Sequence, residues 1–154
     1  MKWLYVRIIA PLLALLKQGM SPDRLALCVA IGVVVGNIPI LGISTVLCAV
    51  IALTFRLNLA AIQIVQATMA PTQILLILPF VRLGEWILRV PPQAVSINEG
   101  LELLAQGVGH AIVALWDAIL HAGFAWMLIA PIAIFSLYKL LTLVFERAAA
   151  RMRQ

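Results

Sequence analysis

The sequence predicts an all-α integral membrane protein, and composition and charge distribution together support that prediction. Of the 154 residues, 64% are hydrophobic and only 11% are charged, whereas soluble domains carry roughly 25% charged residues. Residues 25–55 and 57–81 contain no Asp, Glu, Lys, Arg or His, and 118–138 contains only one histidine. A soluble domain could not shield this much apolar surface, so we expect broken, re-entrant-like helices and a C-terminal transmembrane helix.

The net charge of +5 does not indicate a nucleic-acid-binding protein. The sequence has no basic cluster interleaved with exposed aromatic residues, and its charges flank apolar stretches, where anionic lipid headgroups attract them. We therefore expect membrane lipids as partners and no nucleic acid. Basic residues near both termini predict that both termini face the cytoplasm.

The segments of the chain form a single membrane domain. Residues 1–18 suit a helix in the headgroup layer, because their apolar core is too short to span and has basic and aromatic flanks. Ser21 and Pro22 then predict a helix N-cap and first position. Residues 19–90 form the expected broken-helix core, 91–98 a loop, and 99–154 an amphipathic helix followed by the transmembrane helix and a basic tail.

The first charge-free stretch is too long for one straight span. As a continuous helix, residues 25–55 would extend roughly 46 Å, against a hydrocarbon core of about 30 Å. A proline between two glycines interrupts its centre, at Gly36, Pro39 and Gly42. This pattern predicts two half-helices that meet at a break inside the membrane.

The second charge-free stretch repeats the pattern, with Asn58 as a predicted N-cap and Pro71 among Gln and Thr residues. Two interrupted hydrophobic segments in matching positions indicate a binding site in transporters built from repeats. The alternative is a pair of kinked spans, because Pro and Gly are common in transmembrane helices.

A broken helix in hydrocarbon leaves backbone N–H and C=O groups that side chains, water or a ligand must satisfy. Arginines at the segment ends can hold a phosphate at headgroup depth, and a half-helix that starts inside the membrane directs its positive dipole end at an anion. The candidate residues for an anionic headgroup are Arg24, Asn37, Pro39, Gly42, Ser44, Thr45, Arg56, Thr68, Pro71, Thr72, Gln73 and Arg82. The alternative is a static fold whose breaks satisfy one another and whose arginines extend to the membrane surface.

His110, Asp117 and His121 lie on one side of a helix at spacings of seven and four residues and are the only metal candidates. Polar residues lining an interface explain the same spacing, so we expect no metal and no cofactor. No hydrolase, P-loop or zinc-protease motif is present, so no catalytic residue is assigned. A metal-dependent membrane enzyme is a third hypothesis, which rests only on the His-Asp-His spacing. The spacing of Gly32 and Gly36 is that of helix dimers, which leaves a homodimer as an expectation.

Four short patterns in the core resemble a known family. They are Ser-Pro-Asp-Arg-Leu-Ala at 21–26, Gly-Val-Val-Val-Gly at 32–36, Pro-Ile-Leu-Gly-Ile-Ser-Thr at 39–45 and Arg-Leu-Asn at 56–58. In this order they resemble the bacterial membrane family DUF twenty-sixty-two, a domain of unknown function, over about residues 19–90. The second break departs from the family pattern, which has Ser-Asn-Pro where this chain has Met-Ala-Pro at 69–71.

The resemblance implies envelope or lipid-linked glycan chemistry, since such domains also occur appended to membrane-associated glycosyltransferases. The leading hypothesis is an inner-membrane protein that binds an anionic lipid or lipid-linked intermediate, and in its fuller form translocates it, through a cleft between two broken helices. The alternative hypothesis is a non-catalytic membrane anchor or regulatory partner of an envelope glycosyltransferase.

Overall fold

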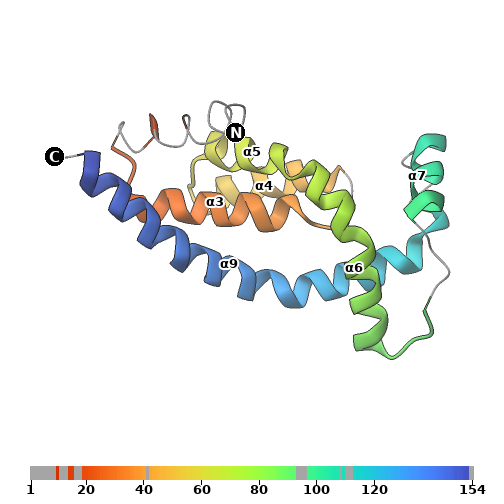
Figure 1. Ribbon diagram of the computed structural model, residues 1–154. Coiled ribbons are helices and arrows are strands. Elements are labelled where there is room, and N and C mark those ends of the chain that lie inside the picture. Colours follow the sequence, from red (N-terminus) through yellow and green to blue (C-terminus); the bar gives the residue numbers. More distant parts are fainter. Residues whose placement is uncertain are drawn as a thin grey trace.

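The computed structural model describes residues 10, 14–15, 19–40, 42–92, 97–107, 109 and 113–152, and no residue among these lies in a strand (Figure 1). The predicted all-α class is confirmed. The helices are α3 Pro22–Gly36, α4 Ile43–Thr54, α5 Leu59–Thr68, α6 Ala70–Leu88, α7 Ile97–Gln106 and α9 Trp116–Met152. The expected helix over 1–18 falls mostly outside the described residues.

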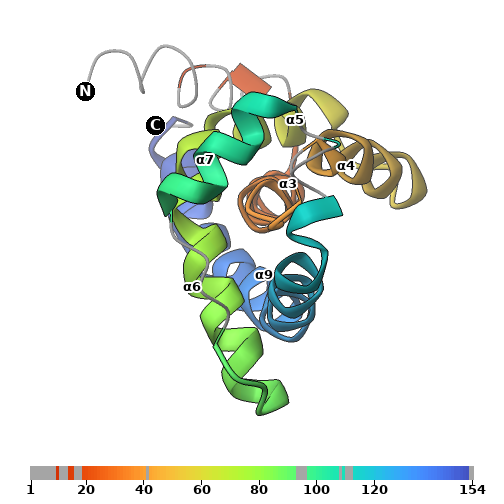
Figure 2. The ribbon, with the colours of Figure 1, turned by 90° about the vertical axis from the view of Figure 1, so that its right-hand side faces the viewer.

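Helix α3 is the centre of the molecule. It packs against α9, α5 and α4, and Figure 2 shows it nearly end-on between them. Ten of its fifteen residues are buried, from Leu25 to Gly36. Because apolar residues occur all around this helix rather than on one stripe, it must be covered on every side.

Helices α3 and α4 form a hairpin. Ser21 accepts a hydrogen bond from the backbone N–H of Arg24 at 3.4 Å, and Pro22 follows it in the first turn, which confirms the predicted cap. The chain turns after Gly36, and α4 then runs back beside α3 (Figure 1). With 15 and 12 residues, the two helices are about 22 and 18 Å long, each shorter than a hydrocarbon core of about 30 Å.

Helix α5 packs closely on the two spaced glycines of α3. A Cβ atom added at Gly32 would lie 2.9 Å from the carbonyl oxygen of Ile62, and one at Gly36 would lie 3.0 Å from Cβ of Met69. The glycine pair therefore serves helix packing within the chain. The homodimer stays a prediction, but the spacing of Gly32 and Gly36 no longer supports it.

The second interruption is a single residue. Helix α5 begins at the predicted cap Asn58, whose Oδ1 accepts the Ala61 N–H at 2.9 Å, and ends at Thr68. Only Met69 separates it from α6, and Pro71 lies in the first turn of α6. A proline is tolerated there because the first-turn N–H groups have no partner within the helix.

Helix α6 leaves the bundle and crosses α9 (Figure 1). The crossing is made by the small residues Gly84, Ala118 and Ala122, all buried. Within the described chain, α6 and α9 are the two helices long and apolar enough to cross a membrane. The span expected over 118–138 lies inside α9, which continues through the basic tail to Met152, while the amphipathic helix expected from residue 99 is shorter and ends at Gln106.

Replacement of Gly84 by alanine should weaken the crossing of α6 and α9. The added Cβ would overlap the backbone of His121. Main-chain atoms of a helix cannot move aside as the end of a flexible side chain can. We expect the free energy of unfolding to fall by about 1–3 kcal/mol. Heat scans in detergent with a thiol-reactive dye measure this, since Cys28 and Cys48 are buried and free.

The matched control is Gly123→Ala in α9, where a Cβ atom meets nothing within 4 Å. This variant should be as stable as the wild type or gain about 0.5–1 kcal/mol from the better helix propensity of alanine. Equal unfolding midpoints for Gly84→Ala and Gly123→Ala would contradict the close contact between Gly84 and the backbone of His121.

Candidate functional site

Side chains from three parts of the chain cover the carbonyl groups at the end of α3. The Asn37 side chain donates to the carbonyl oxygen of Val33 at 2.7 Å. Trp126 of α9 donates its indole N–H to Val34 at 3.1 Å, and the buried Gln73 of α6 donates to Ile38 at 2.7 Å. Because a helix end leaves carbonyl groups without intrahelical partners, these bonds satisfy the first break.

Two glutamines of α5 hold the start of α4. The amide of Gln66 donates to the Ser44 hydroxyl at 2.9 Å, and that of Gln63 donates to the carbonyl oxygen of Thr45 at 3.0 Å. In the described part of the structure one buried acceptor of this region, Asn37 Oδ1, has no hydrogen-bond partner. These bonds join the two interrupted segments, although, among the described residues, no side chain caps the start of α4 or of α6.

The candidate headgroup residues separate into groups. Among the break residues, Asn37, Pro39, Ser44 and Gln73 are buried, Thr68 is half-buried and bonds back to its own helix, and Gly42, Thr45, Pro71 and Thr72 are exposed. Pro71 and Thr72 lie on the surface of the first turn of α6. Of the four buried residues, Asn37 and Gln73 donate to backbone carbonyl groups, Ser44 accepts from Gln66, and Pro39 has no N–H to donate.

Two of the predicted arginines come together at the open end of the hairpin. Arg24 and Arg56 line a cavity of about 620 Å³, which we call the hairpin groove. Its remaining lining residues are Leu15, Gly19, Met20, Ser21, Leu57 and Asn58. The groove thus contains two exposed cations, two helix N-caps and an apolar wall.

The backbone holds Arg56 in an unusual conformation. Its φ is 51°, in the left-handed region. Its N–H donates to Leu53 at 3.4 Å and the next N–H, of Leu57, donates to Ala52 at 2.8 Å, the bond pair of a Schellman helix end. Glycine usually occupies this position, and another residue costs about 1 kcal/mol.

A second cavity lies at the far end of α6. We call it the α6 groove; it measures about 640 Å³ and is lined by Arg82, Glu85, Trp86, Ile87, Arg89, Val90 and Pro92. Arg82 binds the buried carboxylate of Glu85 at 2.9 Å. Arg82 therefore lies in a different groove from Arg24 and Arg56.

The metal candidates do not assemble within the described chain. His110 lies outside the described residues, Asp117 is exposed at the start of α9, and His121 is half-buried. No group of three or more metal-binding side chains occurs among the residues described. The buried Nδ1 of His121 has no hydrogen-bond partner in that part of the chain.

Sequence reasoning missed the contributions of Trp126 and Arg89. No local pattern in the sequence indicates that Trp126 reaches a carbonyl group 92 positions away. For Arg89 the sequence does contain a signal. Like Arg56, this arginine stands at the end of an apolar helix, at a position of positive φ that glycine usually occupies.

Over the residues that the structure describes, the fold is all-helical, and two of its helices are capable of crossing a membrane by length and composition. The chain belongs to a bacterial family described as "Uncharacterized protein conserved in bacteria (DUF2062)", whose family model matches residues 7–154. The resemblance over residues 19–90 is confirmed, and the match extends it through α9. No curated protein and no solved structure matches the chain.

Gln73→Leu should destabilise the hairpin. The substitution leaves the Ile38 carbonyl buried without its donor, which costs about 1–3 kcal/mol. Gln63→Leu is the matched control because its bond to Thr45 lies at the surface of the chain, so its loss leaves no carbonyl group enclosed by protein. Heat scans of both variants measure the difference in stability. An equal loss of stability in Gln63→Leu would contradict the special importance of the buried bond from Gln73 to Ile38.

Proposed function

We propose that this chain is an integral protein of the bacterial inner membrane whose hairpin groove binds the headgroup of an anionic lipid or lipid-linked intermediate. The observation that supports this proposal is the convergence of Arg24 and Arg56 on one groove. Both arginines lie at the end of a helical hairpin that is too short to cross the membrane on either arm.

Exposed apolar side chains support the membrane location. On α4 they include Val46, Val50 and Leu53, exposed by 64%, 53% and 72%. On α9 they include Met127, Ile132 and Phe135. Surfaces of this kind suit contact with lipid, and the α3–α4 hairpin would then be re-entrant.

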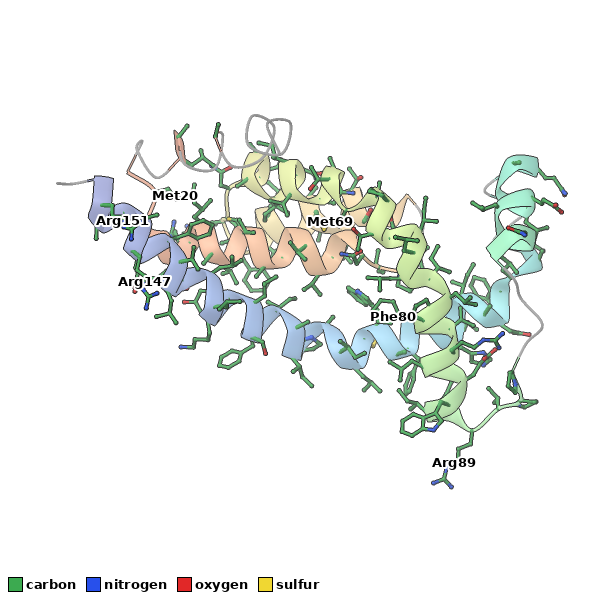
Figure 3. The ribbon with its side chains drawn as sticks, viewed as in Figure 1. Met20, Met69, Phe80, Arg89, Arg147 and Arg151 are labelled. Atoms are coloured by element: carbon green, nitrogen blue, oxygen red, sulfur yellow. The ribbon has the colours of Figure 1, made fainter. Side chains whose placement is uncertain are left out.

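The distribution of basic residues supports an orientation. Arg147 and Arg151 of α9 lie at the same end of the bundle as Met20, which lines the hairpin groove (Figure 3). Basic residues gather on the cytoplasmic side of inner-membrane proteins. We therefore place the groove and the C-terminal tail in the cytoplasmic headgroup layer, and both termini on that side.

The groove has the chemistry that a phosphate group requires. Guanidinium groups bind phosphate oxygens through paired N–H donors. The helices α3 and α5 both begin at the groove, and helix N-termini favour anions. Asp23 in the first turn of α3 is exposed and offsets part of this charge, but it does not line the groove.

Translocation would require the hairpin to open. A headgroup entering the break must displace the bonds from Gln66 to Ser44 and from Gln73 to Ile38. Those satisfied bonds favour the second candidate function, a membrane anchor or regulatory partner of an envelope glycosyltransferase. In that case the groove binds lipid without moving it.

Arg56→Gly tests the proposed function cleanly. Glycine relieves the left-handed backbone, so the variant should fold at least as well as the wild type while losing one charge. With the protein in a neutral detergent, we expect about fivefold weaker binding of short-chain phosphatidylglycerol, because the attraction of one basic residue to an anionic headgroup contributes about 1 kcal/mol. Lys139→Gln, an exposed charge on α9 outside both grooves, is the matched control.

Vesicles of phosphatidylcholine and phosphatidylglycerol into which the protein has been reconstituted separate the two candidate functions. Faster movement of a fluorescent anionic lipid between leaflets, slowed by Arg56→Gly, would support translocation. Binding without movement would support the anchor. Equal binding by the wild type, Arg56→Gly and the control would refute the headgroup site.

A further inference from the structure

The unusual backbone of Arg56 recurs at one other residue of the described chain. Arg89 has φ 56°, and these two arginines are the described non-glycine residues with positive φ. Arg89 donates its N–H to Trp86 at 3.3 Å, and Val90 donates to Glu85 at 3.1 Å. Each arginine thus closes a helix in the same way, and each lines a cavity.

We propose that the α6 groove is a second, separate site for the phosphate of a phospholipid, with Arg89 as its cationic residue and Trp86 beside it. The α6 site itself does not rest on the hairpin groove; only the expected count of two bound phospholipids does. It rests on the composition and position of the α6 groove itself.

The charge of the α6 groove suits a single phosphate diester. Arg82 is held by the buried carboxylate of Glu85 at 2.9 Å, which makes that pair neutral overall. Arg89 supplies the net positive charge, whereas the hairpin groove is lined by two arginines. A phosphate diester carries one negative charge, so one guanidinium balances it.

The surroundings of Arg89 suit a lipid rather than a soluble phosphate. Trp86 is 77% exposed, and tryptophan is enriched at headgroup level because its ring is apolar and its N–H is polar. Ile87 and Val90 complete an apolar border that could contact the glycerol and the first acyl carbons. A free phosphate ion would gain nothing from these three side chains.

The two grooves must bind different lipid molecules. Figure 3 shows Arg89 at the free end of α6, at the opposite side of the molecule from Met20, Arg147 and Arg151. No single headgroup reaches both sites. Two bound phospholipids are therefore expected for each chain.

An interfacial anchor is the competing explanation for Arg89 and Trp86. An anchor attracts headgroups in general, through charge alone, and holds none of them in place. A site retains one phospholipid after the bulk lipid is removed. The two explanations therefore differ in the number of lipids that stay bound.

The test uses the full-length chain in nanodiscs of phosphatidylcholine and phosphatidylglycerol, released into native mass spectrometry. The wild type should retain two phospholipids. Arg89→Gly removes the charge at a position that favours glycine, and should weaken one of the two binding steps about fivefold. Arg56→Gly should weaken the other step, and Lys139→Gln should change neither.

The outcomes separate this proposal from the proposed function. An effect of Arg89→Gly with none of Arg56→Gly would support the α6 groove and refute the hairpin groove. An unchanged lipid count in Arg89→Gly would overturn the second site and leave an anchor. Inorganic phosphate that displaces the second lipid at equal concentration would also overturn it, because the apolar border would then contribute nothing.

Discussion

Backbone polar groups that end inside an apolar molecule must find partners, and this constraint organises the whole structure. The turn after α3 exposes carbonyl groups that no helix satisfies. Gln73 of α6 and Trp126 of α9 supply donors at Ile38 and Val34. The hairpin is therefore tied to both of the long helices, and the second half of the chain completes the first.

The position of the candidate site follows from the same constraint. Because α3 and α4 form a closed hairpin, the start of one lies beside the end of the other. Arg24 follows the cap of α3, and Arg56 closes α4 through its left-handed conformation. Two charges 32 positions apart in the chain are thereby brought to one groove, and no long-range ion pair between described residues holds them together.

Local chemistry explains what could be predicted from the sequence. The caps at Ser21 and Asn58 and the all-α class depend on neighbouring residues and on composition, and all three are confirmed. The partners of the break residues depend on packing between distant helices, so no local pattern indicates that Gln73 reaches Ile38. Pro71 illustrates the same limit, because a proline suits a helix break and a first helical turn equally well, and only the fold decides between them.

The closed hairpin does not by itself exclude movement. Two exposed or half-buried glutamines, Gln63 and Gln66, hold α4 to α5, and hydrogen bonds between helices in membranes average about 0.6 kcal/mol each. In contrast, α3 and α5 meet through the backbone contacts at Gly32, which cannot separate without opening a void. Helix α4 also buries Cys48 and Ala52 in the core, so a headgroup that enters the break must displace this packing as well as the two glutamine bonds. The outer face of α4 is already apolar and exposed, so in the proposed membrane location that face would stay in contact with lipid during such a motion.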